Sequence, residues 1–293
     1  MHRSRVLVLP ALLFATPTPA RAQATPPVDV PMARVTLSFE PSAWYVAPGG
    51  LARFPGSGAS TLRFQDINMD SPRLSSSFEL NADAGRWGGT LRASVFGATD
   101  RGFRPSQPIV VNGAASSSDS TIPPGQASTT SLDFTCMELE ARYRLVQEWR
   151  ETDPDRPWRD MDRRLDLVAG VRLIDYQLSS SATWLVDTGG GPQPHTVAGR
   201  SDATYFMPLV GLKGAVELNE QWTFDLQTTF AGMVGNRESF AWDIMVGFQF
   251  RPIPNLAAQI GYRQLLFVLE DGPTGPMWDG ALAGFFGGLV VRF

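Results

Sequence analysis

The stretch SFAWDIMVGFQFR, residues 239–251, decides the fold because its polarity changes with every residue. The odd positions include Asp243, Gln249 and Arg251. The even positions are all apolar: Phe240, Trp242, Ile244, Val246, Phe248 and Phe250. Successive side chains of a strand point to opposite faces, so this period of two predicts a strand with one apolar face and one polar face.

The same alternation recurs along the chain and predicts an all-β protein. It is clearest in residues 137–145, 222–230 and 281–293. All of the predicted strands exceed the usual five or six residues of globular strands. Ten strands are expected, over residues 34–46, 73–84, 86–98, 132–149, 163–180, 203–218, 221–234, 239–251, 255–270 and 279–293. Residues 49–70 are either an excursion between two strands or a further pair, which would make twelve.

The N-terminal residues are typical of a secretory signal peptide. Arg3 and Arg5 precede an apolar stretch over residues 6–15, and the small residues Ala20 and Ala22 flank Arg21. This order predicts export and cleavage after Ala22. Residues 23–33 contain three prolines and are expected to form an extended lead-in. No later apolar run reaches the length of a membrane-spanning helix.

Two architectures can bury one face of each strand. A soluble sandwich packs its apolar face on a second sheet, whereas a transmembrane barrel turns that face to lipid. The connections favour the barrel, because short ones (residues 84–86, 219–220 and 252–255) alternate with generally longer ones (residues 99–131, 181–202 and 271–278). Outer-membrane barrels alternate short periplasmic turns with longer outer loops in this way.

The chain resembles the Gram-negative outer-membrane β-barrel proteins. The resemblance rests on the final strand GLVVRF, which ends at Phe293, and on the paired segments WDIMVGFQFRPIPN and LAAQIGYRQL. It covers residues 34–293 and implies a closed antiparallel transmembrane β-barrel in the cell outer membrane. It further implies that outer-membrane lipid surrounds the barrel and that Phe293 carries the signal read by the barrel-assembly machinery. The oligomeric state stays open.

The polar faces of these strands predict a charge-lined lumen. Barrels of this size have interiors that side chains fill or nearly fill, so the expected function is structural or that of a narrow pore. Glu138 and Glu140 are expected to form salt bridges with the flanking Arg142 and Arg144. The predicted lumen-lining residues are Glu79, Arg92, Glu138, Glu140, Arg142, Arg144, Arg172, Lys213, Glu217, Asp225, Asp243, Gln249, Gln259, Arg263 and Arg292.

Other residues give little support to catalysis, and we expect a protein that is not an enzyme and that needs no cofactor or metal. Export leaves His195 as the sole histidine, in a predicted loop rich in glycine and proline, and Cys136 is the sole cysteine. Asp66, Asn68 and Asp70 only loosely resemble a calcium loop, because the required glycine and terminal glutamate are missing. An outer-membrane enzyme with a loop-borne site stays an alternative.

The remaining alternative is a secreted, soluble, all-β binding module of lectin-like character. A role with nucleic acid is disfavoured, because the net charge is −4 and no basic run is present. The large aromatic residues are expected to form a girdle at the membrane interfaces, which favours the barrel. They are Trp44, Tyr45, Trp87, Trp149, Tyr205, Trp222, Trp242 and Trp278.

Overall fold

A computed structural model describes residues 35–111, 120–148, 162–187, 189–219, 221–233 and 239–293. The expected signal peptide, its cleavage site at Ala20 and Ala22, the lead-in and Trp149 lie outside these residues. Within the part of the chain that is described, no helix has the length and apolar character needed to cross a bilayer.

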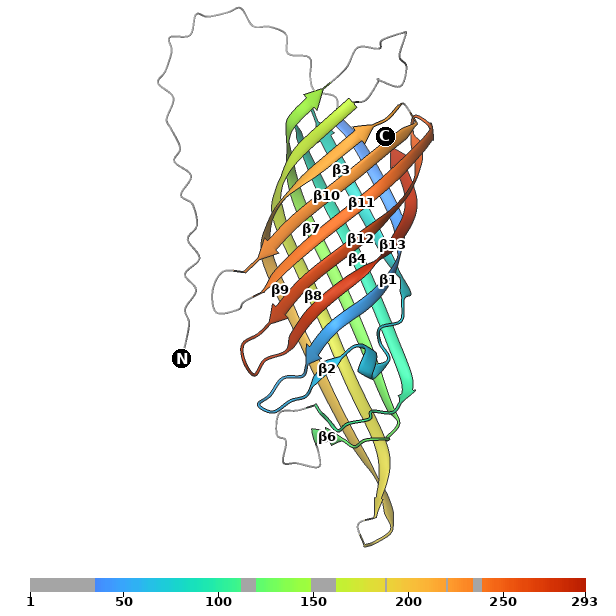
Figure 1. The fold of residues 1–293 in the computed structure, drawn as a ribbon, viewed down its shortest axis with the longest axis vertical. Helices are drawn as coiled ribbons and strands as arrows, with labels where there is room; N and C mark the ends of the chain where they lie inside the picture. Colours follow the sequence, from blue (N-terminus) through green and yellow to red (C-terminus); the bar gives the residue numbers. More distant parts are fainter. Residues whose placement is uncertain (1–34, 112–119, 149–161, 188, 220, 234–238) are drawn as a thin grey trace, which may run out of the picture. The chain divides into compact units, whose positions relative to one another are not determined.

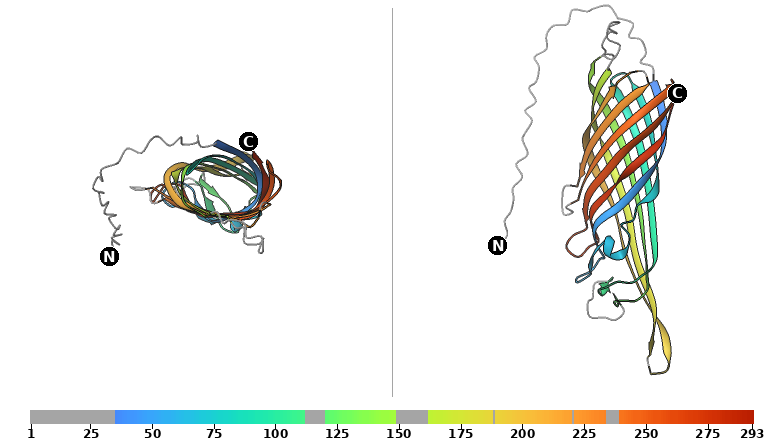
Figure 2. Two further views of the ribbon diagram at one scale, coloured as in Figure 1. Left: turned by 90° about the horizontal axis from the view of Figure 1, so that it is seen from above. Right: turned by 45° about the vertical axis from the view of Figure 1, so that its right-hand side comes forward.

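Ten long antiparallel strands form one closed ring (Figures 1 and 2). Each strand pairs with the next along the chain, and the last pairs with the first. The strands are β1 (Val35–Arg53), β3 (Arg73–Ala84), β4 (Trp87–Phe103), β7 (Ser128–Glu148), β8 (Asp162–Asp187), β9 (Pro192–Glu217), β10 (Trp222–Gly232), β11 (Phe240–Ile253), β12 (Leu256–Glu270) and β13 (Met277–Arg292). The closed antiparallel barrel expected from the sequence is confirmed, and a two-sheet sandwich is wrong.

The seam between β1 and β13 closes the ring. Its register runs from Ser38 opposite Arg292 to Arg53 opposite Met277. The Phe293 backbone N–H extends the seam by donating to the Leu37 carbonyl at 2.9 Å. Closure removes the free sheet edges that would otherwise expose unpaired backbone groups.

The count of ten strands is confirmed, because residues 49–70 form an excursion rather than a spanning pair. β1 continues to Arg53, well past the predicted end at residue 46. The short strand β2 (Thr61–Arg63) then folds back on residues 51–53 of β1. A single 3-10 turn, η1 (Gln65–Ile67), follows and leads to β3.

Part of the sequence expected to be loop is regular structure. Residues 181–202 were expected as a loop, but β8 and β9 continue through them as a two-stranded ribbon (Figure 1). Beyond Ala182, β8 and β9 pair only with each other. Proline lacks a backbone N–H, so Pro192 and Pro194 are tolerated here because no third strand needs a hydrogen bond from them. Between β4 and β7, the strands β5 (Ile109–Val110) and β6 (Thr121–Ile122) form a separate small hairpin.

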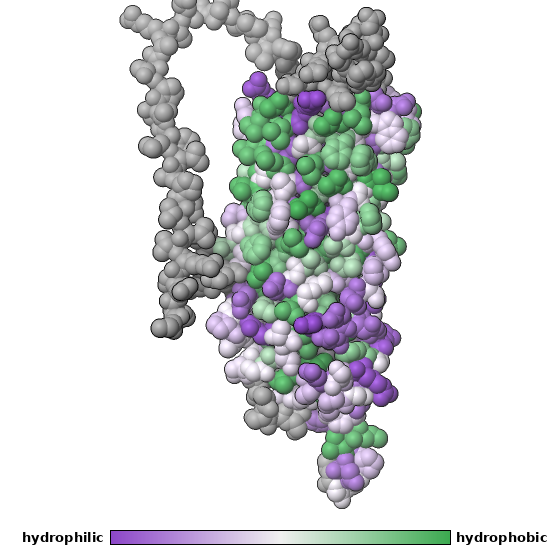
Figure 3. All heavy atoms as spheres, viewed as in Figure 1, coloured by the Kyte–Doolittle hydropathy of each residue, from purple (hydrophilic) through white to green (hydrophobic). Residues whose placement is uncertain are grey.

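The apolar face of each strand points outward, as the alternation predicts. On β11, Phe240 and Phe248 are exposed while Ala241 and Asp243 are buried. On β13, Phe285 and Leu289 are exposed while Leu282 and Val290 are buried. Figure 3 shows that hydrophobic residues are frequent on the visible face of the barrel nearer the end marked C in Figure 1, and that hydrophilic residues are more frequent toward the ribbon.

Candidate functional site: the barrel interior

The interior contains a network of buried charges centred on Glu138 of β7. Arg92 Nη1 of β4 donates to Glu138 Oε2 at 3.0 Å, and Arg263 Nη2 of β12 donates to Oε1 at 3.0 Å. Arg172 Nε of β8 lies 3.3 Å from Oε1. All four side chains are buried, so three arginines from three strands converge on one carboxylate.

The network extends through further acids on the surrounding wall. Glu79 lies 2.7 Å from Arg92 and 3.3 Å from the Lys213 ammonium. Asp243 lies 2.6 Å from Arg263 Nη2 and 3.3 Å from Arg172 Nη2. Buried charges are tolerated only when they are paired and hydrogen-bonded. Arg92 and Arg263 meet that need, whereas Arg172 is paired with two acids but hydrogen-bonds only through Nη2.

Glu140 is bound mainly by an amide. Gln227 Nε2 donates to its two carboxylate oxygens at 3.0 and 3.3 Å, and Arg92 lies farther away at 3.8 Å. Gln227 also accepts from Arg92 Nη2 at 3.0 Å, so it connects the acid to the central cluster.

The expected pairing of Glu138 and Glu140 with Arg142 and Arg144 is wrong. Arg142 lies 3.2 Å from Asp83, and Arg144 lies 3.3 Å from Asp166. A strand rises about 3.4 Å per residue, so Glu138 and Arg142, four apart on one face, are about 13 Å apart and cannot meet. Glu140 and Arg142 are only two apart, but Arg142 turns to Asp83 on β3 and Glu140 is bound by Gln227 on β10.

A polar cavity opens at the end of the barrel that holds Val35 and Arg292; we call it the vestibule. Its volume is about 290 Å³. A narrower chamber of about 50 Å³ shares Glu40, Lys213, Asp225 and Gln249 with it and extends to Trp44 and Phe286. The vestibule wall includes the predicted residues Arg142, Arg144, Lys213, Glu217, Asp225, Gln249 and Arg292, and the chamber also includes Glu79, Arg92, Gln259 and Arg263.

All fifteen predicted lumen residues are buried or half-buried on the inward face. The structure brings Glu79, Arg92, Glu138, Glu140, Arg172, Lys213, Asp243 and Arg263 into the network. Glu217 and Arg292 lie at the vestibule mouth, where Arg292 Nη2 donates to Gln249 Oε1 at 3.4 Å.

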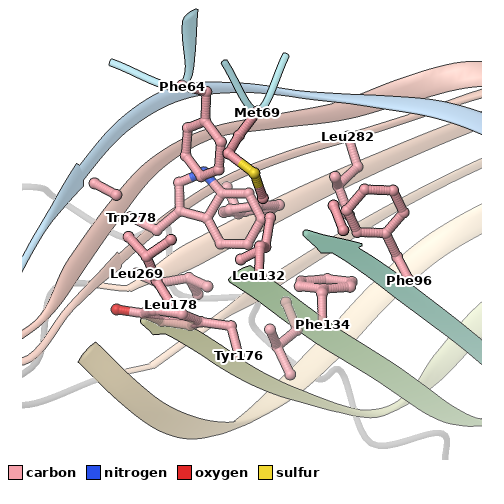
Figure 4. Close-up of a cluster of buried hydrophobic side chains, with 14 of the residues drawn as sticks. Phe64, Met69, Phe96, Leu132, Phe134, Tyr176, Leu178, Leu269, Trp278 and Leu282 are labelled. Atoms are coloured by element: carbon pink, nitrogen blue, oxygen red, sulfur yellow. The ribbon is translucent and has the colours of Figure 1, made fainter. Parts of the chain in front are cut away.

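Beyond the network, the interior holds an apolar layer that the sequence analysis missed (Figure 4). Trp278 lies at its centre and is fully buried. Its ring packs against Phe64 at 5.0 Å, Tyr176 at 5.6 Å and Phe267 at 4.6 Å between centroids. The signal was present in the sequence, because large apolar residues occupy inward positions such as Leu282 and Phe286.

This layer corrects the expectation of an interfacial girdle for three of the aromatic residues. Trp44, Tyr205 and Trp278 are buried inside the barrel and do not belong to an interfacial girdle, whereas Trp87 and Trp222 are exposed on the outer face. Burial is possible because each of these three aromatic residues occupies an inward position of its strand.

The segment that loosely resembled a calcium loop has a different role in the structure. Ile67 and Met69 are buried in the apolar layer and cap it from the 54–72 connection. Asn68 donates from Nδ2 to Asp100 at 2.9 Å. Among the described residues, no three acids, histidines or cysteines gather in a way that could hold a metal ion.

Cys136 and His195 occupy contrasting places. Cys136 is buried, with its Sγ 3.5 Å from Glu138 Oε1. His195 was expected in a loop but lies on β9 in the ribbon, where its ring meets Trp184 edge to face at 4.8 Å.

Comparison with known proteins identifies the fold. No family model matches the sequence, and no curated protein matches it either. The outer-membrane protease OmpT from Escherichia coli is similar in structure, with a TM-score of 0.51 at 12% identity over 88% of this chain and 97% of that one.

Two other solved structures also match over 88% of this chain and 97% of their own chains. Neisserial surface protein A has 10% identity and a TM-score of 0.31. The attachment invasion locus protein Ail of Yersinia pestis has 8% identity and a TM-score of 0.32. At these identities the likeness concerns the fold alone.

Proposed function

We propose that this chain, which has the fold of the Gram-negative outer-membrane β-barrel proteins, is a non-enzymatic membrane scaffold with a closed lumen. In this proposal the barrel anchors the β8–β9 ribbon and the 54–72 connection at the outer surface. The barrel is oriented so that the vestibule opens to the periplasm. The first and the last residues of the barrel domain would then both lie on the periplasmic side.

The observation that carries the closed lumen is the apolar layer around Trp278. Ions cross a membrane through a hydrated polar path. Here Trp278, Phe134 and Phe267 meet at centroid distances of 4.6 to 5.9 Å and are essentially fully buried. Phe64 and Met69 cover this layer from the connection. In this proposal the apolar layer closes the lumen to ions.

The outer face supports residence in a bilayer. Leu74 of β3, Val210 of β9 and Ile260 of β12 each expose more than half of their surface, and these strands are spaced around the ring. A water-soluble protein would rarely tolerate such an apolar band. In the proposed role, outer-membrane lipid covers it and the barrel-assembly machinery inserts the chain through its final strand.

The buried acids support a non-enzymatic interior. A general acid or base must exchange protons with a substrate within hydrogen-bond reach. Glu138 is instead held by three arginines, and Asp243 by two. The likeness to a protease transfers no catalytic residue to this chain, because it concerns the fold alone.

A narrow pore is the second candidate, and the vestibule is the observation that favours it. A polar cavity of about 290 Å³ already enters the barrel from one end. A pore would require the apolar layer to move aside, together with the connection that caps it.

Ion conductance distinguishes the two candidates. We expect full-length protein, refolded in detergent and reconstituted in planar bilayers, to give no steady single-channel steps in symmetric potassium chloride. Flotation of proteoliposomes and heat-modifiable mobility on gels would verify that folded protein is in the membrane. Reproducible unitary steps from such samples would contradict the closed scaffold and support the pore.

A further inference from the structure

An apolar groove crosses the outer face of the barrel, near the end that holds Val35 and Arg292. Its volume is about 460 Å³, and its lining comes from β1, β3, β4 and β7 and from Phe293. The large outward side chains that form its walls are Leu37, Phe39, Leu80, Leu91, Leu139 and Phe293. Among the described residues, none that lines the groove has a charged side chain. The groove therefore suits an uncharged, apolar occupant.

The sheet register explains why this part of the outer face is hollow. One outward row carries large side chains on four adjacent strands: Phe39, Leu80, Leu91 and Leu139. The next outward row, nearer the barrel end, carries small residues on three of these strands: Ala82, Gly89 and Ala141. The row after it carries Trp87 and Tyr143, whose ring centroids are 4.8 Å apart. The groove thus has large aliphatic side chains on one side and aromatic rings on the other.

The groove is wide enough for one hydrocarbon chain. Outward residues on one strand are about 7 Å apart, because a strand rises about 3.4 Å per residue. Small residues in one row therefore leave a channel about 7 Å wide, which is too narrow for an α-helix of about 10–12 Å diameter. A hydrocarbon chain can lie in such a channel lengthwise, across the strands.

A cation lies beyond the aromatic row, in the turn between β3 and β4. Arg86 is exposed there, directly before Trp87. Its backbone carbonyl accepts from the Arg144 N–H at 2.8 Å, which fixes the turn. Tryptophan and tyrosine are enriched at membrane–water interfaces, at the level of the lipid headgroups. Arg86 is therefore placed to pair with the phosphate of a lipid whose acyl chain follows the groove.

We infer that the groove binds one acyl chain of a phospholipid of the periplasmic leaflet, with the lipid phosphate beside Arg86. The inference rests on the proposed placement of the barrel in the outer membrane, because lipid then surrounds this face. Bulk lipid is as apolar as the groove. The preference for this position therefore comes from the dispersion contacts along a fitted chain and from the phosphate.

Native mass spectrometry tests the inference on the full-length protein, folded in a non-ionic detergent. Dioleoylphosphatidylglycerol is added at rising ratios to the protein. We expect one lipid molecule to be retained saturably before any further lipid binds. Glycerol 3-phosphate carries a phosphate but no acyl chain, and it should not be retained.

Matched variants place the acyl chain. Gly89→Leu fills the groove, and a Cβ at Gly89 would meet only the Glu140 carbonyl oxygen, at an ordinary 3.6 Å. It should weaken retention about tenfold or more, because many dispersion contacts are lost together. Gly287→Leu is the control, since Gly287 is exposed on β13 outside the groove and a Cβ there would meet only the Gln259 carbonyl oxygen, at 3.7 Å. It should leave retention unchanged.

Arg86→Gln tests the phosphate contact. It should weaken retention about fivefold, since one cation near an anionic lipid surface contributes about that much. Retention equal to that of the unaltered protein would overturn the place assigned to the phosphate.

Flotation of proteoliposomes and heat-modifiable mobility test the membrane placement separately. If the unaltered protein passes both tests and retains no lipid saturably, the inference is overturned and the proposed function stands. If the protein fails to float, both are overturned. The inference is also overturned if Gly89→Leu retains lipid as well as Gly287→Leu does. Dimers that Gly89→Leu abolishes would overturn it too, because a second copy of the chain would then occupy the groove.

Discussion

At the scale of single residues, Glu138 is the centre of the charged interior. Its carboxylate lies within 3.3 Å of Arg92, Arg172 and Arg263, and it is 1% exposed. Removal of one member of a buried ion network leaves the remaining charges desolvated and uncompensated. The stability of the barrel should therefore depend on this side chain more than on acids at the mouth.

We predict that Glu138→Gln lowers the free energy of unfolding by about 3–5 kcal/mol, the cost of breaking a buried ion pair. A urea titration of the protein folded in detergent measures it. Glu217→Gln is the matched control, because its side chain is 40% exposed and lies 3.9 Å from Arg251; it should cost no more than about 1 kcal/mol. Similar losses in the two variants would show that the network is not a stabilising unit.

The two faces of β11 give a second residue-scale prediction. Ile244 lies on the apolar outward face, and Gln249 faces the vestibule. Ile244→Arg should cost about 2–4 kcal/mol, since it places a charge in the middle of the lipid face. Gln249→Arg should cost less, because water in the vestibule can solvate the guanidinium. Refolding titrations compare them, and the reverse order would mean that the faces are assigned wrongly.

At the scale of elements, β13 is the strand that completes the ring. It pairs with β12 on one side and with β1 on the other. Its last residues also hold the seam near its end, where Phe293 and Leu37 exchange backbone hydrogen bonds at 2.9 and 3.5 Å. A barrel that loses this part of the seam exposes unpaired backbone groups to lipid.

We predict that truncation of residues 290–293 sharply reduces insertion of folded protein. The physical reason is the loss of the seam hydrogen bonds, and loss of the expected assembly signal at Phe293 would add to it. The yield of heat-modifiable protein in isolated outer membranes measures the effect. Phe293→Tyr serves as a control that keeps an aromatic side chain and every backbone hydrogen bond. Normal yield from the truncated chain would count against both the seam hydrogen bonds and the assembly signal as requirements for insertion.

At the scale of the whole molecule, the outward apolar band and the charged interior invert the usual arrangement of a soluble protein. Exposed Leu74, Trp87 and Phe285 lie outside, while Arg92, Arg172 and Arg263 lie inside. This inversion is expected only for a chain that folds with lipid as its outer solvent.

We therefore predict that the processed protein fractionates with outer membranes and migrates faster on gels before heating than after it. Closed barrels in detergent resist unfolding until they are heated, because their strands form a ring without a free edge. Density-gradient separation of membranes, with protein detection in each fraction, measures the location. Recovery as a soluble periplasmic protein would contradict the proposed placement.

The sequence by itself determined the all-β class and which face of each strand is which, whereas the closure of the ring is seen only in the structure. Residues 240–250 alternate strictly, and side-chain alternation depends only on the local backbone, so Asp243 and Gln249 could be placed inside without any structure. The pattern left ten or twelve strands, because residues 49–70 could be an excursion or a further pair, and the structure decided for the excursion.

Only the tertiary structure decided which inward residues meet. Glu138 takes Arg92 from 46 residues away and Arg263 from 125 residues away, rather than Arg142 on its own strand. The tilt and register of the ring set these pairings, and alternation carries no information about them. Trp44 and Trp278 lie inside because they occupy inward positions of their strands, which alternation could have shown. That Trp278 packs against Phe64, Tyr176 and Phe267 was decided only by the closed ring.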